Sequence, residues 1–338
     1  MSSSNQRSTY VPTITLLMAI ACIGVCAIHM MYATSIDPNS LCGKIIVLGQ
    51  QGVPIFFVIS GFVIPYSLWN SGYKIKNFFS YLLKRSIRID PPYLLAIALT
   101  LVQLLVFGNE YFDLKRFFYH LLYLIPFTNE KWYQGTFWTL GIEFQFYIII
   151  GLLFPFIKNG SKNIISLALI SIAFTGHFIE LPKQEALILS HIHCFCIGIV
   201  CLLSKKKKIT LLETHAILII ITAYLCFRIS YVTGIIPYPT TIAILQINFE
   251  SAVSNFLGKI SYSLYIFHLL IGGHVLLLLN GITISPYLLS GTLVISCIGF
   301  AYLFYLIIEV PALAWSERIK TKRTDLKPSL SPELNPKP

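Results

Sequence analysis

Long apolar stretches recur along this sequence, and they limit its possible folds more than any other feature. One covers residues 11–32, and comparable stretches of 18 to 24 residues follow as far as residue 309. A helix needs about 20 apolar residues to cross the roughly 30 Å hydrocarbon core of a bilayer. The composition agrees, because 56% of the residues are hydrophobic and 12% are charged, about half the charge of an average soluble domain. We therefore predict an all-α fold, a polytopic helical membrane protein.

The apolar pattern predicts about ten transmembrane helices. They are expected at residues 11–32, 45–68, 91–108, 138–157, 163–181, 186–203, 211–232, 236–256, 260–279 and 287–309. The eighth is the weakest, because Asn248, Glu250 and Asn255 lie within it. The apolar segment 117–127 has only eleven residues, which suits an interfacial or re-entrant piece better than a membrane span.

The positive charges are divided unevenly between the two predicted sides of the membrane. With both termini inside, 19 of the 25 Lys and Arg residues fall in predicted cytoplasmic segments and 6 on the outer side. This asymmetry favours an N-in, C-in topology, because cytoplasmic loops carry an excess of Lys and Arg. Topology thus explains the net charge of +11, and we expect no nucleic-acid partner. Residues 1–323 form one predicted transmembrane domain, and the polar, Pro-rich residues 324–338 form a predicted disordered cytoplasmic tail.

Two ionisable side chains lie inside predicted spans near the outer face. His29 is near the end of the first span, and Glu143 is near the start of the fourth. Ionisable residues in transmembrane helices are usually functional or paired, because an unpaired charge there is costly. The two residues are expected at the same depth, so a functional pair is one interpretation. A polar side chain satisfied at the membrane interface is the alternative for His29.

A basic cluster precedes the third predicted span. Arg85 and Arg88 are three residues apart and share a helix face beside Lys84, at the expected cytoplasmic mouth of that span. Arg side chains bind phosphate through parallel hydrogen bonds, so one interpretation is an anion site. Ordinary positive-inside charge is the other. Glu309 falls at the same expected depth, where a structural ion pair is the favoured interpretation.

Two further segments contain polar groups that have a structural explanation. Gly52, Ser60 and Gly61 lie in the second span, where small residues allow another helix to approach closely. Residues 191–196 include His and Cys side chains, but neighbouring residues on a helix point to different faces, and structural zinc sites use wider spacings. We therefore expect helix packing at the first segment and no metal at the second.

Four segments together resemble the membrane acyltransferase-3 family of bacterial inner membranes. They are GVPIFFVISGF at 52–62, FWTLGIEFQFY at 137–147, LGKISYSLYIFH at 257–268 and YLIIEVP at 305–311. The resemblance implies transfer of an acyl group, most often acetyl, from acyl-CoA to a hydroxyl of an extracytoplasmic or lipid-linked glycan. It implies a multi-pass protein of the bacterial inner membrane whose partners are acyl-CoA, the glycan acceptor and membrane lipid. No cofactor beyond the donor is expected.

The resemblance also suggests roles for the candidate residues. His29 is expected to be the general base that takes the proton from the acceptor hydroxyl, because imidazole titrates near neutral pH. Glu143 is expected to orient it. Lys84, Arg85 and Arg88 are expected to bind the phosphates of acyl-CoA. The residues expected to line the cavity or to support the site are Ser60, Tyr93, Trp138, His268 and Glu309.

Two positions depart from the family pattern. Pro54 stands where an acidic residue is common, which is the milder change. The other departure is in the first span, where the family has an arginine eleven residues before the histidine. In this chain that position is Met18. Eleven residues of helix turn about 20° past three full turns and rise about 16.5 Å, so Met18 is expected below His29 on the same face. A thioether cannot replace a guanidinium, which leaves open whether activity is weakened or lost.

Two other functions fit the same sequence features. A transporter or flippase of an anionic envelope precursor also needs a basic mouth and intramembrane acids, and a catalytically inactive family member would explain Met18. For the enzyme, Arg85 and Arg88 are expected at the inner mouth, with His29 and Glu143 near the outer face. Donor and acceptor would then lie on opposite sides of most of the bilayer, joined by the long pantetheine arm of CoA.

Overall fold

The computed structural model describes residues 11–107, 111–176, 178 and 187–319. All regular elements of these residues are helical, and no strand is present among them. The helices are α1 (Pro12–Ala33), α2 (Leu41–Val47), α3 (Gly52–Asn70), α4 (Phe78–Phe107), α5 (Leu114–Leu121), α6 (Trp138–Asn159), α7 (Lys162–Thr175), α8 (Ile192–Lys205), α9 (Leu211–Arg228), α10 (Tyr231–Ile235), α11 (Pro237–Gln246), α12 (Ala252–Leu278), α13 (Pro286–Phe304) and α14 (Val310–Arg318). A π-helical turn, Tyr305–Glu309, joins α13 to α14. The expected tail at 324–338 lies outside the described residues.

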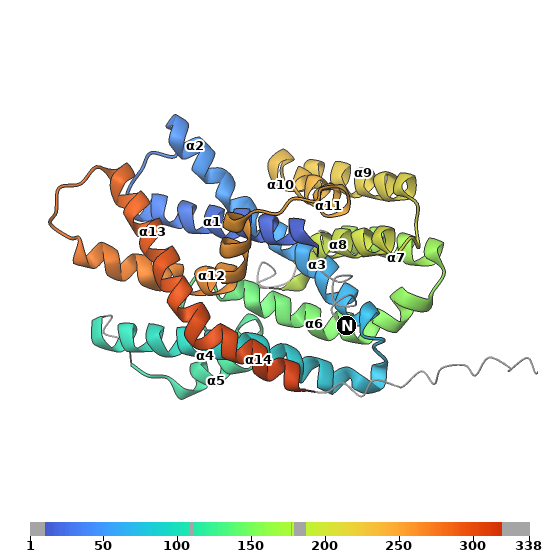
Figure 1. The fold of residues 1–338 in the computed structure, drawn as a ribbon, viewed down its shortest axis with the longest axis horizontal. Helices are drawn as coiled ribbons and strands as arrows, with labels where there is room; N and C mark the ends of the chain where they lie inside the picture. The colour runs from blue at the N-terminus through green and yellow to red at the C-terminus, as the bar shows by residue number, and fades with distance from the viewer. Residues whose placement is uncertain (1–10, 108–110, 177, 179–186, 320–338) are drawn as a thin grey trace, which may run out of the picture.

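The long helices pack into a bundle in which distant parts of the chain meet (Figure 1). The most extensive pairs are α1 with α12, α3 with α8, and α12 with α13. Helices α3 and α8 approach closely at two glycines. A Cβ atom at Gly61 would lie 2.5 Å from the carbonyl oxygen of Phe195, and one at Gly198 would lie 2.3 Å from that of Val58. Small residues thus allow this contact, which confirms the packing role expected for Gly61.

Eight helical segments of the described residues are long and apolar enough to cross a membrane, so the predicted fold class is confirmed. Two of the ten expected spans are shorter, since α7 has 14 residues and α11 has 10. At about 1.5 Å per residue, α11 covers only about half of a hydrocarbon core. The number of crossings and the N-in, C-in topology stay predictions.

The eighth expected span, 236–256, is wrong as a continuous helix. Residues 247–251 are non-helical and separate α11 from α12. A capping box explains the new start, because the Ser251 side chain accepts a hydrogen bond from the Ser254 N–H and the Ser254 side chain accepts one from the Ser251 N–H. The polar residues Asn248 and Glu250 precede this cap. Local capping therefore outcompetes the apolar pattern at this point.

The third expected span begins earlier than the sequence pattern indicates. Helix α4 starts at Phe78 and continues through Pro91 and Pro92. Proline removes a donor from the helical ladder, and a carbonyl freed inside a membrane helix needs another partner. The carbonyls that lose their helical donors are those of Ile87 and Arg88, four residues before the two prolines. The Tyr262 hydroxyl of α12 donates to the next carbonyl, that of Ile89, at 2.7 Å. This contact ties α12 to the proline-containing part of α4.

Two large apolar clusters form the interior, and they meet at α6. One includes Phe146, Phe154 and Phe195 from α6 and α8. The other includes Tyr93 of α4 and residues of α1, α12 and α13. Phe144 of α6 packs against both clusters. The polar residues described below lie along this boundary.

Candidate active site

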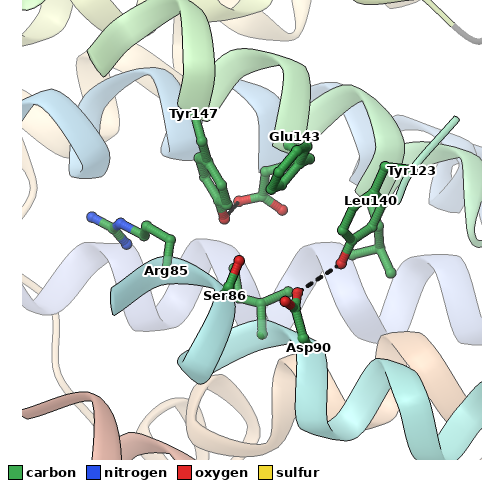
Figure 2. A pocket seen from close by; sticks show the side chains of 9 residues that line it. Arg85, Ser86, Asp90, Tyr123, Leu140, Glu143 and Tyr147 are labelled. Atoms are coloured by element: carbon green, nitrogen blue, oxygen red, sulfur yellow. Dashed lines mark hydrogen bonds between the residues drawn. The ribbon is translucent and has the colours of Figure 1, made fainter. Parts of the chain in front are cut away.

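A small cavity of about 10 Å³, with room for about one water molecule, lies between α4 and α6. Figure 2 shows Arg85, Ser86 and Asp90 on α4 facing Glu143 and Tyr147 on α6. Its lining residues are Arg85, Ser86, Ile89, Asp90, Tyr123, Leu140, Glu143, Phe144 and Tyr147. A space with this many charged and hydroxyl groups inside a membrane helix bundle indicates a functional site, because such groups are costly there.

Glu143 is held by two hydroxyl groups. The Ser60 side chain of α3 donates to Oε1 of Glu143 at 3.0 Å, and the Tyr147 hydroxyl donates to the same oxygen at 2.7 Å. Tyr147 lies four residues after Glu143, so both side chains are on one face of α6. The carboxylate is directed into the space between the two helices (Figure 2). Ser60 therefore has a hydrogen-bonding role beside the expected helix packing.

The two arginines of α4 lie beside this carboxylate without bonding to it. The Arg85 guanidinium is 5.7 Å from the centre of the Tyr147 ring and 5.9 Å from that of Tyr81. The charges of Glu143 and Glu309 act on Arg88, whose side chain is exposed. Neither guanidinium lies within 4.0 Å of a carboxylate of the described residues. Their hydrogen-bond donors are therefore available to an anion.

The position of Arg85 contradicts the expected layout. Arg85 and Glu143 line one cavity, so their predicted separation across most of the bilayer is wrong. The cause is the early start of α4 at Phe78. Seven residues of helix precede Arg85, which places it about 10 Å inside the helix instead of at its mouth. The neighbouring Lys84 is half-buried.

Glu309 lies in the π-helical turn between α13 and α14. It is buried, and its Oε2 accepts a hydrogen bond from the Ser263 hydroxyl of α12 at 2.8 Å. The expected ion pair between Glu309 and the arginine cluster is wrong, because no arginine of the described residues lies within 4.0 Å of its carboxylate. The charge of Glu309 acts on Arg88 from a longer distance. A π turn adds a residue to the helical ladder and frequently marks a functional site.

Asp90 is a site residue that the sequence analysis missed. Its Oδ1 accepts a hydrogen bond from the Tyr123 hydroxyl at 2.9 Å (Figure 2). Tyr123 has a φ of 55°, an uncommon backbone conformation for a tyrosine. Its ring stacks between Phe144 at 4.7 Å and Tyr93 at 5.2 Å. The signal in the sequence was an acid five residues after Arg85, in a segment already singled out for its arginines.

His29 does not contact Glu143; its ring faces His268 of α12, with centroids 5.1 Å apart. His268 is fully buried. Its Nδ1 lies 2.8 Å from the Tyr265 carbonyl, which can only accept, so Nδ1 carries the proton. Its Nε2 is buried with no hydrogen-bond partner among the described residues. The structure therefore gives His29 a neutral acceptor as neighbour instead of the expected carboxylate.

One face of α12 connects the arginine level with the histidine level. Tyr262, Tyr265 and His268 are spaced three residues apart along it. Tyr262 bonds to Ile89 beside the arginines, and the Tyr265 hydroxyl lies 2.9 Å from the Thr139 hydroxyl of α6. From residue 262 to residue 268 the helix rises about 9 Å. The two groups of candidate residues are thus close to one another within the bundle.

The comparison with known protein families decides the class of this protein. A family model described as an acyltransferase domain matches residues 11–308. The chain belongs to the acyltransferase-3 family. It is a multi-pass membrane protein and an acyltransferase, which confirms the resemblance found in the sequence.

The acyltransferase is similar to two proteins from a virus and a bacterium. "Putative acetyltransferase ORF330" of Acidianus two-tailed virus is 28% identical over 294 residues, which cover 80% of this chain and 86% of the relative. "Nodulation protein 10" of Rhizobium leguminosarum bv. viciae is 31% identical over 128 residues, which cover 32% of this chain and 34% of the relative. No solved structure matches the acyltransferase.

The other expected residues of the acyltransferase lie around these groups. Trp138 packs against Phe57 and His191, with ring centroids 6.4 Å and 5.3 Å away, and Tyr93 is buried beside Tyr123. Met18 is half-buried against the apolar cluster of α3, α6 and α8, so it faces the bundle. Within the described part of the chain, no group of three or more His, Cys, Asp or Glu residues is arranged to hold a metal ion.

Proposed function

We propose that the acyltransferase moves an acetyl group from cytoplasmic acetyl-CoA to a hydroxyl of an extracytoplasmic or lipid-linked glycan, in a bacterial inner membrane. The observation that carries this proposal is the connected polar interior. Two arginines that form no ion pair with another described residue, and a histidine pair, lie beside one face of α12, which rises about 9 Å from Tyr262 to His268. The name of the viral relative favours acetyl as the acyl group.

The donor binds at the arginines. CoA carries several phosphates, and guanidinium groups bind phosphate with two parallel hydrogen bonds. Arg85 and Arg88 offer such donors from the inner half of α4, with Lys84 beside them. The pantetheine arm then passes between α4 and α6, which separate to admit it, because the cavity there has room for about one water molecule. Its amide N–H groups meet the carboxylates of Asp90 and Glu143, which point into that space (Figure 2).

His29 is the general base, and His268 positions it. A neutral imidazole protonated on Nδ1 accepts a hydrogen bond at Nε2. His268 offers this acceptor beside His29. An N–H of His29 held there leaves its other ring nitrogen to face the acceptor hydroxyl. This arrangement gives His268 the orienting role that was expected of Glu143.

The transfer step needs one proton acceptor and one leaving group. As the acceptor oxygen attacks the thioester carbon, its proton passes to His29 and the new C–O bond forms. The C–S bond then breaks, and the CoA sulfur leaves, taking the proton from His29. Ser60 donates to Glu143, so in this scheme it holds the carboxylate and carries no acyl group.

Transport of the acetyl group without CoA follows from this layout. Polyanionic CoA stays on the side of the basic segments, and its thioester reaches His29, near the C-terminal end of α1, without spanning most of the bilayer. The test is transfer in proteoliposomes of known orientation, with radiolabelled acetyl-CoA outside and an envelope glycan fraction inside. We expect labelled glycan only when acetyl-CoA faces the basic segments. Labelling only when both substrates share that side would overturn the proposal.

A further inference from the structure

A groove lies on the surface of the α12–α13 pair, away from the cavity described above. Its volume is about 400 Å³, which is within the range of small-molecule sites. Lys259 of α12 lines it, together with Tyr302 of α13 and Tyr305 of the π turn. Its apolar walls include Phe256 and Leu306. Figure 1 shows α13 passing across α12.

Three polar groups of the groove are without partners in the described structure. The Lys259 amine and the hydroxyls of Tyr302 and Tyr305 form no hydrogen bond with another described residue. Together they are one cation and two O–H donors around one space. This combination is complementary to a phosphate, whose oxygens accept several hydrogen bonds and carry negative charge.

The surroundings indicate which kind of phosphate. The walls are exposed apolar side chains, since Phe256 is 40% exposed, Leu306 45% and the adjacent Ile307 69%. Exposed apolar surface on a membrane helix faces lipid. Lys and Tyr are the residues that mark the boundary between hydrocarbon and headgroups. The groove therefore opens to the bilayer at headgroup depth, on the cytoplasmic side by the predicted topology.

We propose that this groove binds the headgroup of an anionic phospholipid. The phosphate contacts Lys259 and the two tyrosine hydroxyls, and one acyl chain covers Phe256 and Leu306. Basic pockets between transmembrane helices bind anionic headgroups in this way. A zwitterionic lipid is disfavoured because its own cation competes with Lys259. Since Glu309 belongs to the same π turn as Tyr305, the bound lipid would also support the turn that carries Glu309.

The test is lipid binding by the purified full chain in neutral detergent. Phosphatidylglycerol and phosphatidylcholine are titrated separately, and bound lipid is counted by native mass spectrometry. We expect the chain to retain phosphatidylglycerol in preference to phosphatidylcholine. Lys259→Gln should bind phosphatidylglycerol about fivefold more weakly, the effect of one cation near a membrane surface. Lys76→Gln removes an exposed cation from a 3₁₀ turn elsewhere and should bind as the unmodified chain does.

Two further arms identify the source of the phosphate. Inorganic phosphate should not displace the lipid, because the acyl chain supplies part of the affinity, and acetyl-CoA should not displace it either. Displacement by acetyl-CoA would mean that the groove is the donor site, which overturns the proposal. Equal phosphatidylglycerol affinity in Lys259→Gln would overturn it as well. If Lys259→Gln does not fold, the double variant Tyr302→Phe, Tyr305→Phe carries the same expectation.

Discussion

His29 of α1 and His268 of α12 face each other with ring centroids 5.1 Å apart. Nδ1 of His268 donates to the Tyr265 carbonyl, which leaves Nε2 of His268 as a buried acceptor beside His29. A buried acceptor without a partner is costly. We therefore expect His268, and not Glu143, to orient the proposed base.

His268→Ala should therefore lower kcat about 10- to 100-fold and leave the KM for acetyl-CoA unchanged, because the lost interaction lies far from the donor phosphates. His268→Gln should recover part of the rate, since its amide oxygen can accept the same hydrogen bond. Steady-state kinetics of the purified variants measure both effects.

A matched control lies six residues further along the same helix. His274 also bonds through Nδ1 to the carbonyl four residues before it, at 2.8 Å, but its ring has no histidine neighbour among the described contacts. His274→Ala should leave kcat unchanged. If His268→Gln is as slow as His268→Ala, while both are folded, the hydrogen-bonding role is contradicted and a packing role is left.

Arg88→Ala should raise the KM for acetyl-CoA about 10- to 100-fold, the expected loss from a charged hydrogen bond. Turnover at saturating donor should change little, because the phosphates are remote from the reacting carbon. Arg88→Lys keeps the charge and loses the planar fork, so its KM should be intermediate. An unchanged dependence on acetyl-CoA in both Arg85→Ala and Arg88→Ala would show that these charges serve topology alone.

Glu143→Gln separates the charge of this residue from its hydrogen bonds. The amide oxygen can still accept from Ser60 and Tyr147, so thermal stability should stay close to that of the unmodified chain. Glu143→Ala leaves two hydroxyls without a partner and should destabilise the fold by about 1–3 kcal/mol. Both variants should lose activity if the negative charge is required. Full activity of Glu143→Gln in an acetyl-transfer assay would remove the carboxylate from the proposed mechanism.

Acid should destabilise the segment around α5 by protonating His120. Its Nδ1 lies 2.9 Å from the Arg116 carbonyl, and its Nε2 accepts the Tyr133 N–H at 2.9 Å, so the neutral ring is fully bonded. Burial lowers the pKa of His120 to about 4, against about 6.5 in an unfolded chain. Between these values the unfolded chain binds the extra proton, so stability falls as pH decreases through this window.

At pH values below the folded pKa of about 4, the free energy of unfolding has fallen by about 3 kcal/mol. Thermal unfolding of the purified chain measured between about pH 7 and about pH 5 should therefore show a declining Tm. His120→Asn should flatten this decline, and the half-buried His274→Asn should not. An identical pH slope in His120→Asn would exclude His120 as its source.

The sequence allowed the helical class and the family to be predicted, because apolar length and local motifs are one-dimensional signals. Depth was harder. The sequence pattern took Pro91 as a helix start, whereas α4 begins at Phe78 and continues through Pro91. This earlier start places Arg85 within the helix, in the cavity beside Glu143, and not at a helix mouth.

Which side chains face one another could not be predicted from the sequence either. His29 and Glu143 have similar expected depths, but side chains at one depth can face different neighbours around a bundle. His29 lies on the face of α1 that packs against α12, whereas Glu143 faces Ser60 and α4. Met18 illustrates the same limit, since its face could be predicted from helical periodicity but its packing against the apolar cluster could not.

The central claim is that His29 is the base for acyl transfer from CoA. The most direct measurement is the transfer of label from radiolabelled acetyl-CoA to an isolated envelope glycan fraction by the purified chain, compared with His29→Ala. We predict that His29→Ala binds acetyl-CoA normally and transfers label about 10²–10⁴-fold more slowly. Transfer by folded His29→Ala at the rate of the unmodified chain would contradict the claim.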